Sequence, residues 1–450
     1  MRTCLLVLCI LANFFAQSQN TALKEVLENP SHNGDWTYSN PSADWQLEAF
    51  LQNGEPDGYW REYEKNRLVL EGQYNQGVKE GLWKEFYPSG KLKAEGSYKN
   101  GNETGTWKEY HPNGTLAFEI NYTDGLKNGP LKAWYSSGNI FYQKYYLTGL
   151  EEGVYAEYYE NGQVMVKGYF EDGKANGLWQ EYDNAGNLLA KYYFTNDMLQ
   201  GEVSHYHANG TLQQVEVWRD SVLQSVGDYF TPDGRQLPGG DMRFGNGTRN
   251  FYNQQGQLVS SATFTDGEMK GPCHFYNLQE QKVATTIFSE GQLTGPFVEY
   301  HPDGNIAAKG TYRAGIKQGE YSAYYPHQHM AAEGFYHNGM KDSLWVYYYN
   351  NRKVKSLGYY LMNKKDGFWE EYYENGSLKS AGNYFLGVRD SVWLEYHPDG
   401  ILAARGAYQA NIKTGTWQFF DEEGRFVYAS TYENGTANGS MTEYGYYKGN

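Results

Sequence analysis

Hydrophobic and polar residues alternate in short runs along most of the chain, and each run ends in a turn-forming sequence. Within residues 83–87, Trp83, Glu85 and Tyr87 occupy alternate positions, which is the period of a β-strand rather than of a helix. A Pro-Ser-Gly sequence follows, and residues 92–98 alternate in the same way before a second glycine-containing turn. This stretch predicts one β-hairpin.

The hairpin pattern recurs throughout the chain. Residues 81–92 are matched by residues 105–116, 24 positions later. The leading position then continues at 129, 153, 177, 201, 247, 271, 295, 319, 343, 367, 391, 415 and 439. Earlier copies begin at Gly34 and Gly58, and a period of this length is the signature of a repeat array.

The sequence of the first turn predicts its geometry. Proline at the first turn position, as in Pro88-Ser89-Gly90, fixes φ near −65°, which a primed hairpin turn cannot accommodate. We therefore expect a type I turn in which the glycine is left-handed at a bulge.

The predicted fold class is all-β: an elongated repeat array of antiparallel β-hairpins that forms a single-layer twisted meander. A lone hairpin is marginally stable, but stacked hairpins bury one another's side chains. Two residues of the period are missing near Pro238, so we expect a break in the sheet near 235–246. This stretch is either a bend or hinge in the sheet, or a copy of the repeat whose sequence has diverged and that has no role of its own.

The predicted organisation has five parts. Residues 1–18 form a signal peptide, and 19–57 form an N-terminal segment with a degenerate capping repeat. Repeats occupy 58–236 and 247–450, separated by an irregular break at 237–246.

Composition supports an ordered array. Aromatic residues make up 17% of the 450 residues, although mean hydropathy is −0.76, and disordered chains lack aromatics. The 53 glycines lack the three-residue period of collagen and are explained by two turns in each repeat.

The N-terminus predicts export. A basic start at Arg2, an apolar run over 4–15 and small residues at Ala16 and Ser18 are typical of a secretory signal peptide. The run is too short to span a membrane, so we expect a secreted, periplasmic or cell-surface protein.

Charge limits the partners. Removal of residues 1–18 takes away Arg2 and changes the net charge of −15 to −16, which disfavours nucleic acid and anionic membrane surfaces. Cys273 is then the sole cysteine, and an intramolecular disulfide is excluded.

A glutamate recurs two residues after the tryptophan position, on the same strand face. The functional hypothesis is an acidic, aromatic groove for a sugar or a cationic peptide, and the alternative is a solvated rim paired with Lys or Arg. The candidate binding face comprises Trp83, Glu85, Trp107, Glu109, Trp179, Glu181, Trp369, Glu371, Trp393 and Glu395.

The sequence predicts no catalytic residue, metal site or cofactor. His111, His301 and His397 stand beside turns where other copies have tyrosine, and Cys273 occupies a tryptophan position, which favours a buried thiol. Zinc, phosphate-loop and nucleophile-elbow motifs are missing from the sequence, and the glutamate ladder marks no single pair.

The repeat resembles the bacterial variant of the MORN repeat family, most closely in residues 367–378, Gly-Phe-Trp-Glu-Glu-Tyr-Tyr-Glu-Asn-Gly-Ser-Leu. The resemblance extends over 34–450 and implies an all-β single-layer sheet with a scaffold or binding role and no catalysis. Some bacterial relatives are labelled antitoxin components.

We therefore expect a non-catalytic secreted scaffold that binds a protein along its β surface. One alternative is a cell-envelope glycan-binding protein that uses the Trp/Glu face, and another is an antitoxin-like component. An open meander has two edge strands, through which a homodimer could form.

Overall fold

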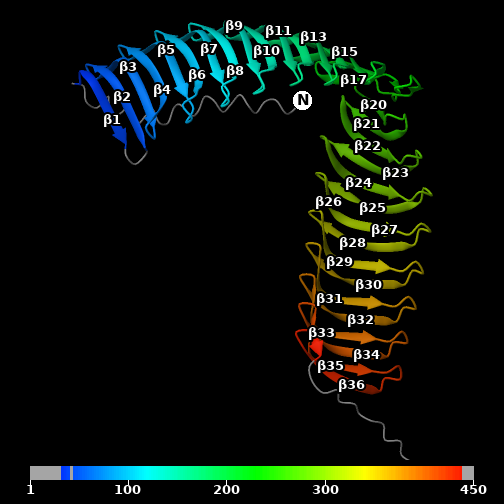
Figure 1. Ribbon diagram of the computed structural model, residues 1–450. Coiled ribbons are helices and arrows are strands. Elements are labelled where there is room, and N and C mark those ends of the chain that lie inside the picture. Colours follow the sequence, from blue (N-terminus) through cyan, green and yellow to red (C-terminus); the bar gives the residue numbers. More distant parts are fainter. Residues whose placement is uncertain (1–31, 41–43, 438–450) are drawn as a thin grey trace, which may run out of the picture. The chain divides into compact units, whose positions relative to one another are not determined.

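The computed structural model describes residues 32–40 and 44–437, and every regular element in these ranges is a β-strand (Figure 1). The strands pair antiparallel with their neighbours in sequence, so the predicted all-β meander is confirmed. The predicted signal peptide and the copy that begins at Gly439 lie outside the described residues.

The first compact unit comprises residues up to Gln213 together with Trp218–Ser221. From β1 to β15, each strand pairs antiparallel with the next. The strands are β1 (Gly34–Asn40), β2 (Trp45–Gln52), β3 (Glu55–Glu64), β4 (Arg67–Asn75), β5 (Val78–Phe86), β6 (Leu92–Lys99), β7 (Asn102–Tyr110), β8 (Leu116–Thr123), β9 (Leu126–Trp134), β10 (Ile140–Leu147), β11 (Leu150–Tyr158), β12 (Val164–Glu171), β13 (Lys174–Tyr182), β14 (Leu188–Thr195), β15 (Met198–Tyr206) and β16 (Leu212–Arg219).

The second unit comprises Gln214–Val217 and the chain from Val222. Its long sheet starts at β20, and β25 pairs with both β26 and β27. The strands are β17 (Val222–Val226), β18 (Tyr229–Phe230), β19 (Gln236–Leu237), β20 (Gly247–Tyr252), β21 (Leu258–Thr265), β22 (Glu268–Tyr276), β23 (Lys282–Ser289), β24 (Gln292–Tyr300), β25 (Ile306–Arg313), β26 (Ile316–Lys317), β27 (Gly319–Tyr324), β28 (Met330–His337), β29 (Met340–Tyr348), β30 (Val354–Leu361), β31 (Lys364–Tyr372), β32 (Leu378–Phe385), β33 (Val388–Tyr396), β34 (Leu402–Gln409), β35 (Ile412–Phe420), β36 (Phe426–Glu433) and β37 (Thr436–Ala437).

Two kinds of turn join the strands. After β5, the Gly90 N–H donates to the Tyr87 carbonyl at 2.8 Å and Gly90 has φ 81°, as the proline-containing sequence predicts. After β6, Asn100 and Gly101 both have positive φ, which defines a two-residue primed turn. The Gly101 N–H also donates to the Lys79 carbonyl at 3.0 Å, so this turn links one hairpin to the hairpin before it.

A glycine in each return strand receives the tryptophan of the next hairpin. The β4–β5 register shifts between Glu71 and Gln73, and Trp83 lies across Gly72 there. A Cβ on Gly72 would be 2.1 Å from the Trp83 ring, so no side chain fits. Trp83 Nε1 donates to the Gln73 carbonyl at 3.2 Å. The same glycine–tryptophan contact occurs at Gly96–Trp107, Gly168–Trp179, Gly334–Trp345, Gly358–Trp369, Gly382–Trp393 and Gly406–Trp417.

The tryptophans and the periodic tyrosines form a one-dimensional core. In the second unit, Trp369, Tyr384, Trp393 and Tyr408 succeed one another with ring centroids 6.1, 5.2 and 6.1 Å apart, each pair edge to face. Trp393 is 0% exposed although the sheet has a single layer. Cations complete the cover: the Lys365 ammonium lies 4.1 Å from the Trp369 ring centroid.

Other apolar side chains replace tryptophan in several copies without opening the core. Leu131, Phe297 and Cys273 occupy the tryptophan position and are each 2% exposed. The predicted buried cysteine is confirmed, and burial raises the pKa of the Cys273 thiol.

Close backbone packing fixes the residues around the predicted break. A Cβ on Gly239 would lie 1.9 Å from the Gly227 carbonyl oxygen, and one on Gly240 would lie 2.1 Å from that of Thr248. The Asn250 N–H donates to the Gly239 carbonyl at 2.8 Å. The paired glycines are therefore required by packing within the second unit.

The glycine–tryptophan contact predicts the effect of one methyl group. Gly382→Ala would place a Cβ 2.3 Å from the Trp393 ring, and we expect it to lower the free energy of unfolding by about 3 kcal/mol. Urea unfolding followed by tryptophan fluorescence measures this change.

Gly367→Ser is the matched control. Gly367 has φ 68° with open space around it, and Ser343 and Ser391 hold the same repeat position at φ 60° and 62°. We expect a cost of about 1 kcal/mol, the price of a left-handed L-residue. Equal effects of the two substitutions would contradict the packing role of Gly382.

Candidate binding face

The predicted tryptophans lie in the core rather than on an open surface. Trp83, Trp179, Trp369 and Trp393 are buried and Trp107 is half-buried. Aromatic edges pack against these rings, and a lysine or arginine side chain also covers Trp83, Trp369 and Trp393, which leaves no open ring face on the buried tryptophans for a sugar to stack on. We call the sheet face that carries the tryptophans and the Tyr98-type tyrosines the packed face.

The predicted glutamates lie on the packed face, half-buried, in different surroundings. Lys93 Nζ lies 2.5 Å from Glu85, and Lys365 Nζ lies 3.5 Å from Glu371. Glu181 accepts a hydrogen bond from the Tyr192 hydroxyl at 2.7 Å. Glu395 stands opposite Ser380 and Ala404. The candidate glutamates therefore form ion pairs with lysine in some copies of the repeat only.

Glu109 differs from its neighbours in charge balance. Burial raises the pKa of its carboxyl, and the negative charge of Glu85 adds to this, whereas Lys93 opposes it. Because Lys93 lies against Glu85, its charge is shared between two carboxylates.

The turn histidines have a structural role. His111 Nε2 lies 2.9 Å from the Trp134 carbonyl oxygen, and His301 and His397 make the same contact with Tyr324 and Phe420. At the same repeat position, the Tyr87 hydroxyl donates a hydrogen bond to the Tyr110 carbonyl at 2.6 Å. Over residues 32–40 and 44–437, no cluster of three or more His, Cys, Asp or Glu side chains is arranged to hold a metal ion.

The opposite side, which we call the open face, carries the residues next to each tryptophan. On β11 and β12, Val154 pairs with Tyr169, and on β13 and β14, Leu178 pairs with Tyr193. Val154 is 64% exposed and Tyr193 is 47% exposed. Exposed large apolar side chains recur on this face at Leu82, Tyr145, Val154, Tyr169, Leu178, Tyr193, Phe335, Leu344, Tyr359, Phe368 and Val392.

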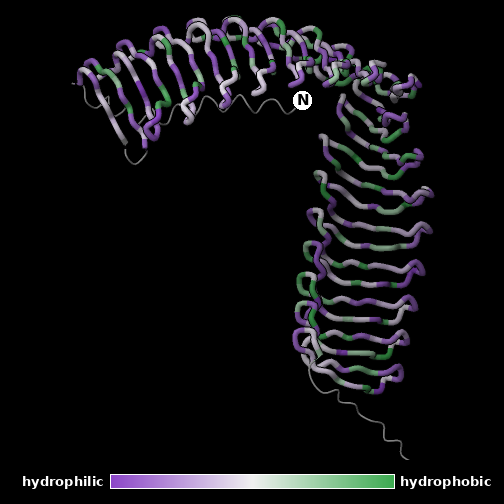
Figure 2. Tube along the Cα trace, in the orientation of Figure 1, coloured by the Kyte–Doolittle hydropathy of each residue, from purple (hydrophilic) through white to green (hydrophobic). Residues whose placement is uncertain are grey.

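Sequence reasoning overlooked the open face, although its signal was present. The residue before each tryptophan is apolar in many copies, as at Leu178, Leu344 and Phe368. Strict alternation places that residue on the side opposite the buried ring, where a solvated strand normally has a polar residue. Figure 2 shows hydrophobic positions that recur across the strands of both units.

A row of cross-strand residues, which we call the middle row, runs along the open face one position beyond the tryptophans. From β3 to β9 its charges alternate, because Arg61, Glu71, Lys84, Glu95, Lys108, Glu119 and Lys132 stand opposite one another in succession. This part of the row is neutralised by its own neighbours.

The middle row is unbalanced elsewhere. Lys167 stands between Ala156 and Gln180, and Lys191 stands between Gln180 and Ser204.

In the second unit the row carries unmatched charges of both signs. Lys309 stands between Val298 and Ser322, Arg405 stands between Leu394 and Gln418, and only the stretch from β27 to β31 is acidic. Glu333 stands between Ser322 and Val346, and Glu370 stands between Leu357 and Ala381. Tyrosine hydroxyls donate to both carboxylates, from Tyr348 at 2.6 Å and from Tyr372 at 3.0 Å.

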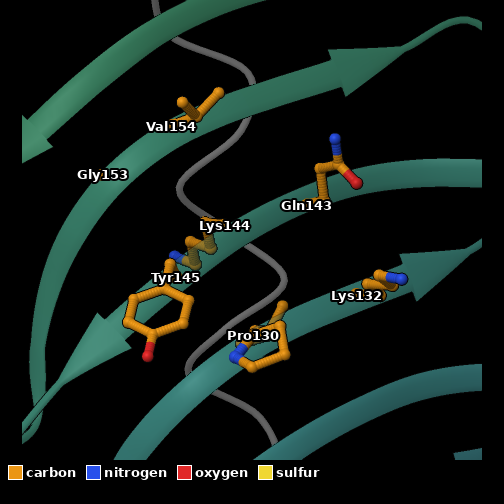
Figure 3. A pocket seen from close by; sticks show the side chains of 8 residues that line it. Pro130, Lys132, Gln143, Lys144, Tyr145, Gly153 and Val154 are labelled. Atoms are coloured by element: carbon orange, nitrogen blue, oxygen red, sulfur yellow. The ribbon is translucent and has the colours of Figure 1, made fainter.

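One shallow groove lies on the open face of each unit. The first, of about 420 Å³, includes Pro130, Lys132, Tyr145 and Val154 (Figure 3). The second, of about 460 Å³, is lined by Glu320, Tyr321, Ser322, Glu333, Gly334, Phe335, Ser343 and Leu344.

The two grooves occupy equivalent positions of the repeat. Pro130 and Glu320 each follow the leading position of a copy, and Tyr145 and Phe335 are their cross-strand partners. Both grooves are lined by apolar side chains, but the charged lining residues are Lys132 and Lys144 in the first groove and Glu320 and Glu333 in the second.

The described residues contain no helix that is long and apolar enough to cross a membrane.

Comparison with known proteins supports the repeat assignment. Seven segments match the MORN repeat variant family, at residues 79–100, 103–124, 151–172, 175–196, 199–220, 293–314 and 365–385. These hairpins are MORN repeat variants, as the sequence predicts. No curated protein matches the chain.

Solved structures give only distant likenesses. The GtfA/B complex is 18% identical, with 27% of this chain and 22% of that chain covered and a TM-score of 0.13. The TcdB2-TccC3-Cdc42 complex is 11% identical, with coverages of 90% and 29% and a TM-score of 0.15. The Photorhabdus luminescens Tc holotoxin pore is 11% identical, with coverages of 89% and 25% and a TM-score of 0.15. This chain spans less than a third of each of those chains, and such TM-scores carry no argument.

The environment of Glu109 predicts a pH-dependent stability effect. Since burial raises its pKa, the folded state favours the neutral carboxyl, and the stability it contributes is lost as pH rises through the folded-state pKa. We expect Glu109→Gln, which stays neutral, to raise the free energy of unfolding at pH 7. The gain should vanish near pH 3, below the usual glutamate pKa of about 4.3.

Urea unfolding at both pH values measures this difference, with Glu371→Gln as the control. That substitution removes an ion pair with Lys365 and should bring no gain at pH 7. A Glu109→Gln variant no more stable than the parent at pH 7 would show that the carboxylate is well solvated.

Proposed function

We propose that this chain, whose two units both carry MORN repeat variants, is an exported, non-catalytic scaffold that binds a protein through its open face. The observation that carries the proposal is that the two faces of the sheet differ in the burial of their apolar side chains. The packed face buries its aromatic rings, whereas the open face leaves tyrosine, leucine, valine and phenylalanine side chains in solvent.

The chemistry of the open face favours a protein as partner. Exposed apolar patches rimmed by polar residues are typical of protein interaction sites, and aromatic residues supply much of the binding energy at such sites. Val154, Tyr169, Leu178 and Tyr193 form two adjacent apolar cross-strand pairs, and Lys167 and Lys191 lie beside them.

The packed face supports the non-catalytic part of the proposal. Several of its carboxylates are engaged in supporting contacts, as Glu85 is with Lys93 and Glu181 is with Tyr192. A catalytic pair would need two carboxyls free to act on the two sides of one reacting bond.

Site-specific photocrosslinking tests the binding face. A benzophenone amino acid in place of Tyr169, on the open face, should give a defined protein adduct in the exported fraction of the native host. The same group in place of Ser89, in an exposed turn, should give none. Mass spectrometry of the adduct identifies the partner.

A second substitution makes the test quantitative. Leu178→Asp should weaken purified partner binding by about 30-fold, the equivalent of about 2 kcal/mol for a buried contact of a binding site. Adducts that form equally from Ser89, or that survive Leu178→Asp unchanged, would argue against the open face. Polysaccharide binding without any protein adduct would favour the glycan-binding alternative.

A further inference from the structure

The open faces of the two units carry equivalent grooves whose charged lining residues differ in sign. Both grooves lie at equivalent repeat positions, and both combine an aromatic with an aliphatic side chain: Tyr145 with Val154 in one, Phe335 with Leu344 in the other. All four side chains are exposed. The two surfaces therefore have the same apolar pattern.

The charges beside these side chains have no cross-strand counterpart of opposite sign. Both strand neighbours of Lys167 are uncharged, and so are those of Lys191, Glu333 and Glu370. Between β3 and β9 the same row alternates in sign, which shows that the repeat can neutralise itself. An uncompensated row on a sheet face offers a complementary charged surface a favourable contact and disfavours a surface of the same sign.

We propose that the open face of β11–β14 of one copy docks on the open face of β27–β31 of a second copy of this chain. This inference rests on the proposed function, because it names the partner of the same face. Lysines of one copy would lie against glutamates of the other, and the apolar pairs of both copies would leave solvent together.

The repeat itself favours a second copy over an unrelated protein. Both surfaces are built on antiparallel strands about 4.8 Å apart, so exposed apolar side chains recur at the same interval on both. Each copy carries both surfaces, so a second copy always supplies the complementary one.

The proposal differs from pairing of edge strands. Edge pairing would extend the sheet through backbone hydrogen bonds and would be insensitive to charges in the middle of the open face. Face docking depends on those charges.

Charge reversal of the full-length mature chain tests the proposal by sedimentation velocity. Lys167→Glu with Lys191→Glu should weaken self-association at least about 100-fold, since like charges then face one another. Glu333→Lys with Glu370→Lys should do the same. An equimolar mixture of the two variants should restore association, because every contact between them is again of opposite sign.

The matched control is Lys84→Glu with Lys108→Glu, which changes the net charge equally on the self-neutralised part of the row. It should leave association unchanged. Restoration in the mixture also shows that both variants are folded.

A parent chain that stays monomeric at about 100 μM, or self-association that both double variants retain, would overturn the inference. If the chain is monomeric but Tyr169 still crosslinks another protein, the proposed function stands and the second copy is excluded as its partner. Association lost in both variants and not regained on mixing would also overturn it.

Discussion

The contact on which the array depends is that of a tryptophan ring lying across a glycine of the preceding hairpin. In β4–β5 the register shift beside Gly72 leaves room for Trp83, and its Nε1 hydrogen-bonds the Gln73 carbonyl at the shift. One side chain thus fills a space, satisfies a backbone group and joins two hairpins. Trp179 lacks part of this, because its buried Nε1 has no acceptor, yet its ring still packs on Gly168.

This contact explains how a single layer of strands can bury aromatic rings. Trp369 meets Gly358 beneath its ring, the edges of Tyr360 and Tyr384 on both sides and Lys365 above it. Trp345, Trp393 and Trp417 have the same surroundings, whereas Phe170 and Phe194 flank Trp179. Stability then accumulates between neighbours, as in other repeat proteins. The opposite face is not needed for packing, and its residues are free to serve recognition.

The period and turn chemistry of the sequence were sufficient to predict the hairpins, the left-handed Gly90 and the buried position of Cys273. Alternation also placed Trp83 and Glu85 on one face correctly. Which face is covered could not be read from alternation, because burial of Trp83 depends on a register shift and on Gly72 in another strand. The difference between Glu85 and Glu109 likewise depends on which carboxylate Lys93 approaches.

The packed face serves stability, so residues there are limited by packing. Residues that differ from copy to copy on the open face are not limited in this way. A change on the packed face must keep the position apolar and covered, as it is at Leu131, Phe297 and Cys273, which replace tryptophan and are each 2% exposed. A change in the middle row has no such limit. Its charge alternates from β3 to β9, is basic at Lys167, and takes both signs in the second unit, as at Lys309 and Glu333. The array therefore keeps one packing arrangement for folding while its exposed row varies, and the proposed binding would take its specificity from that row.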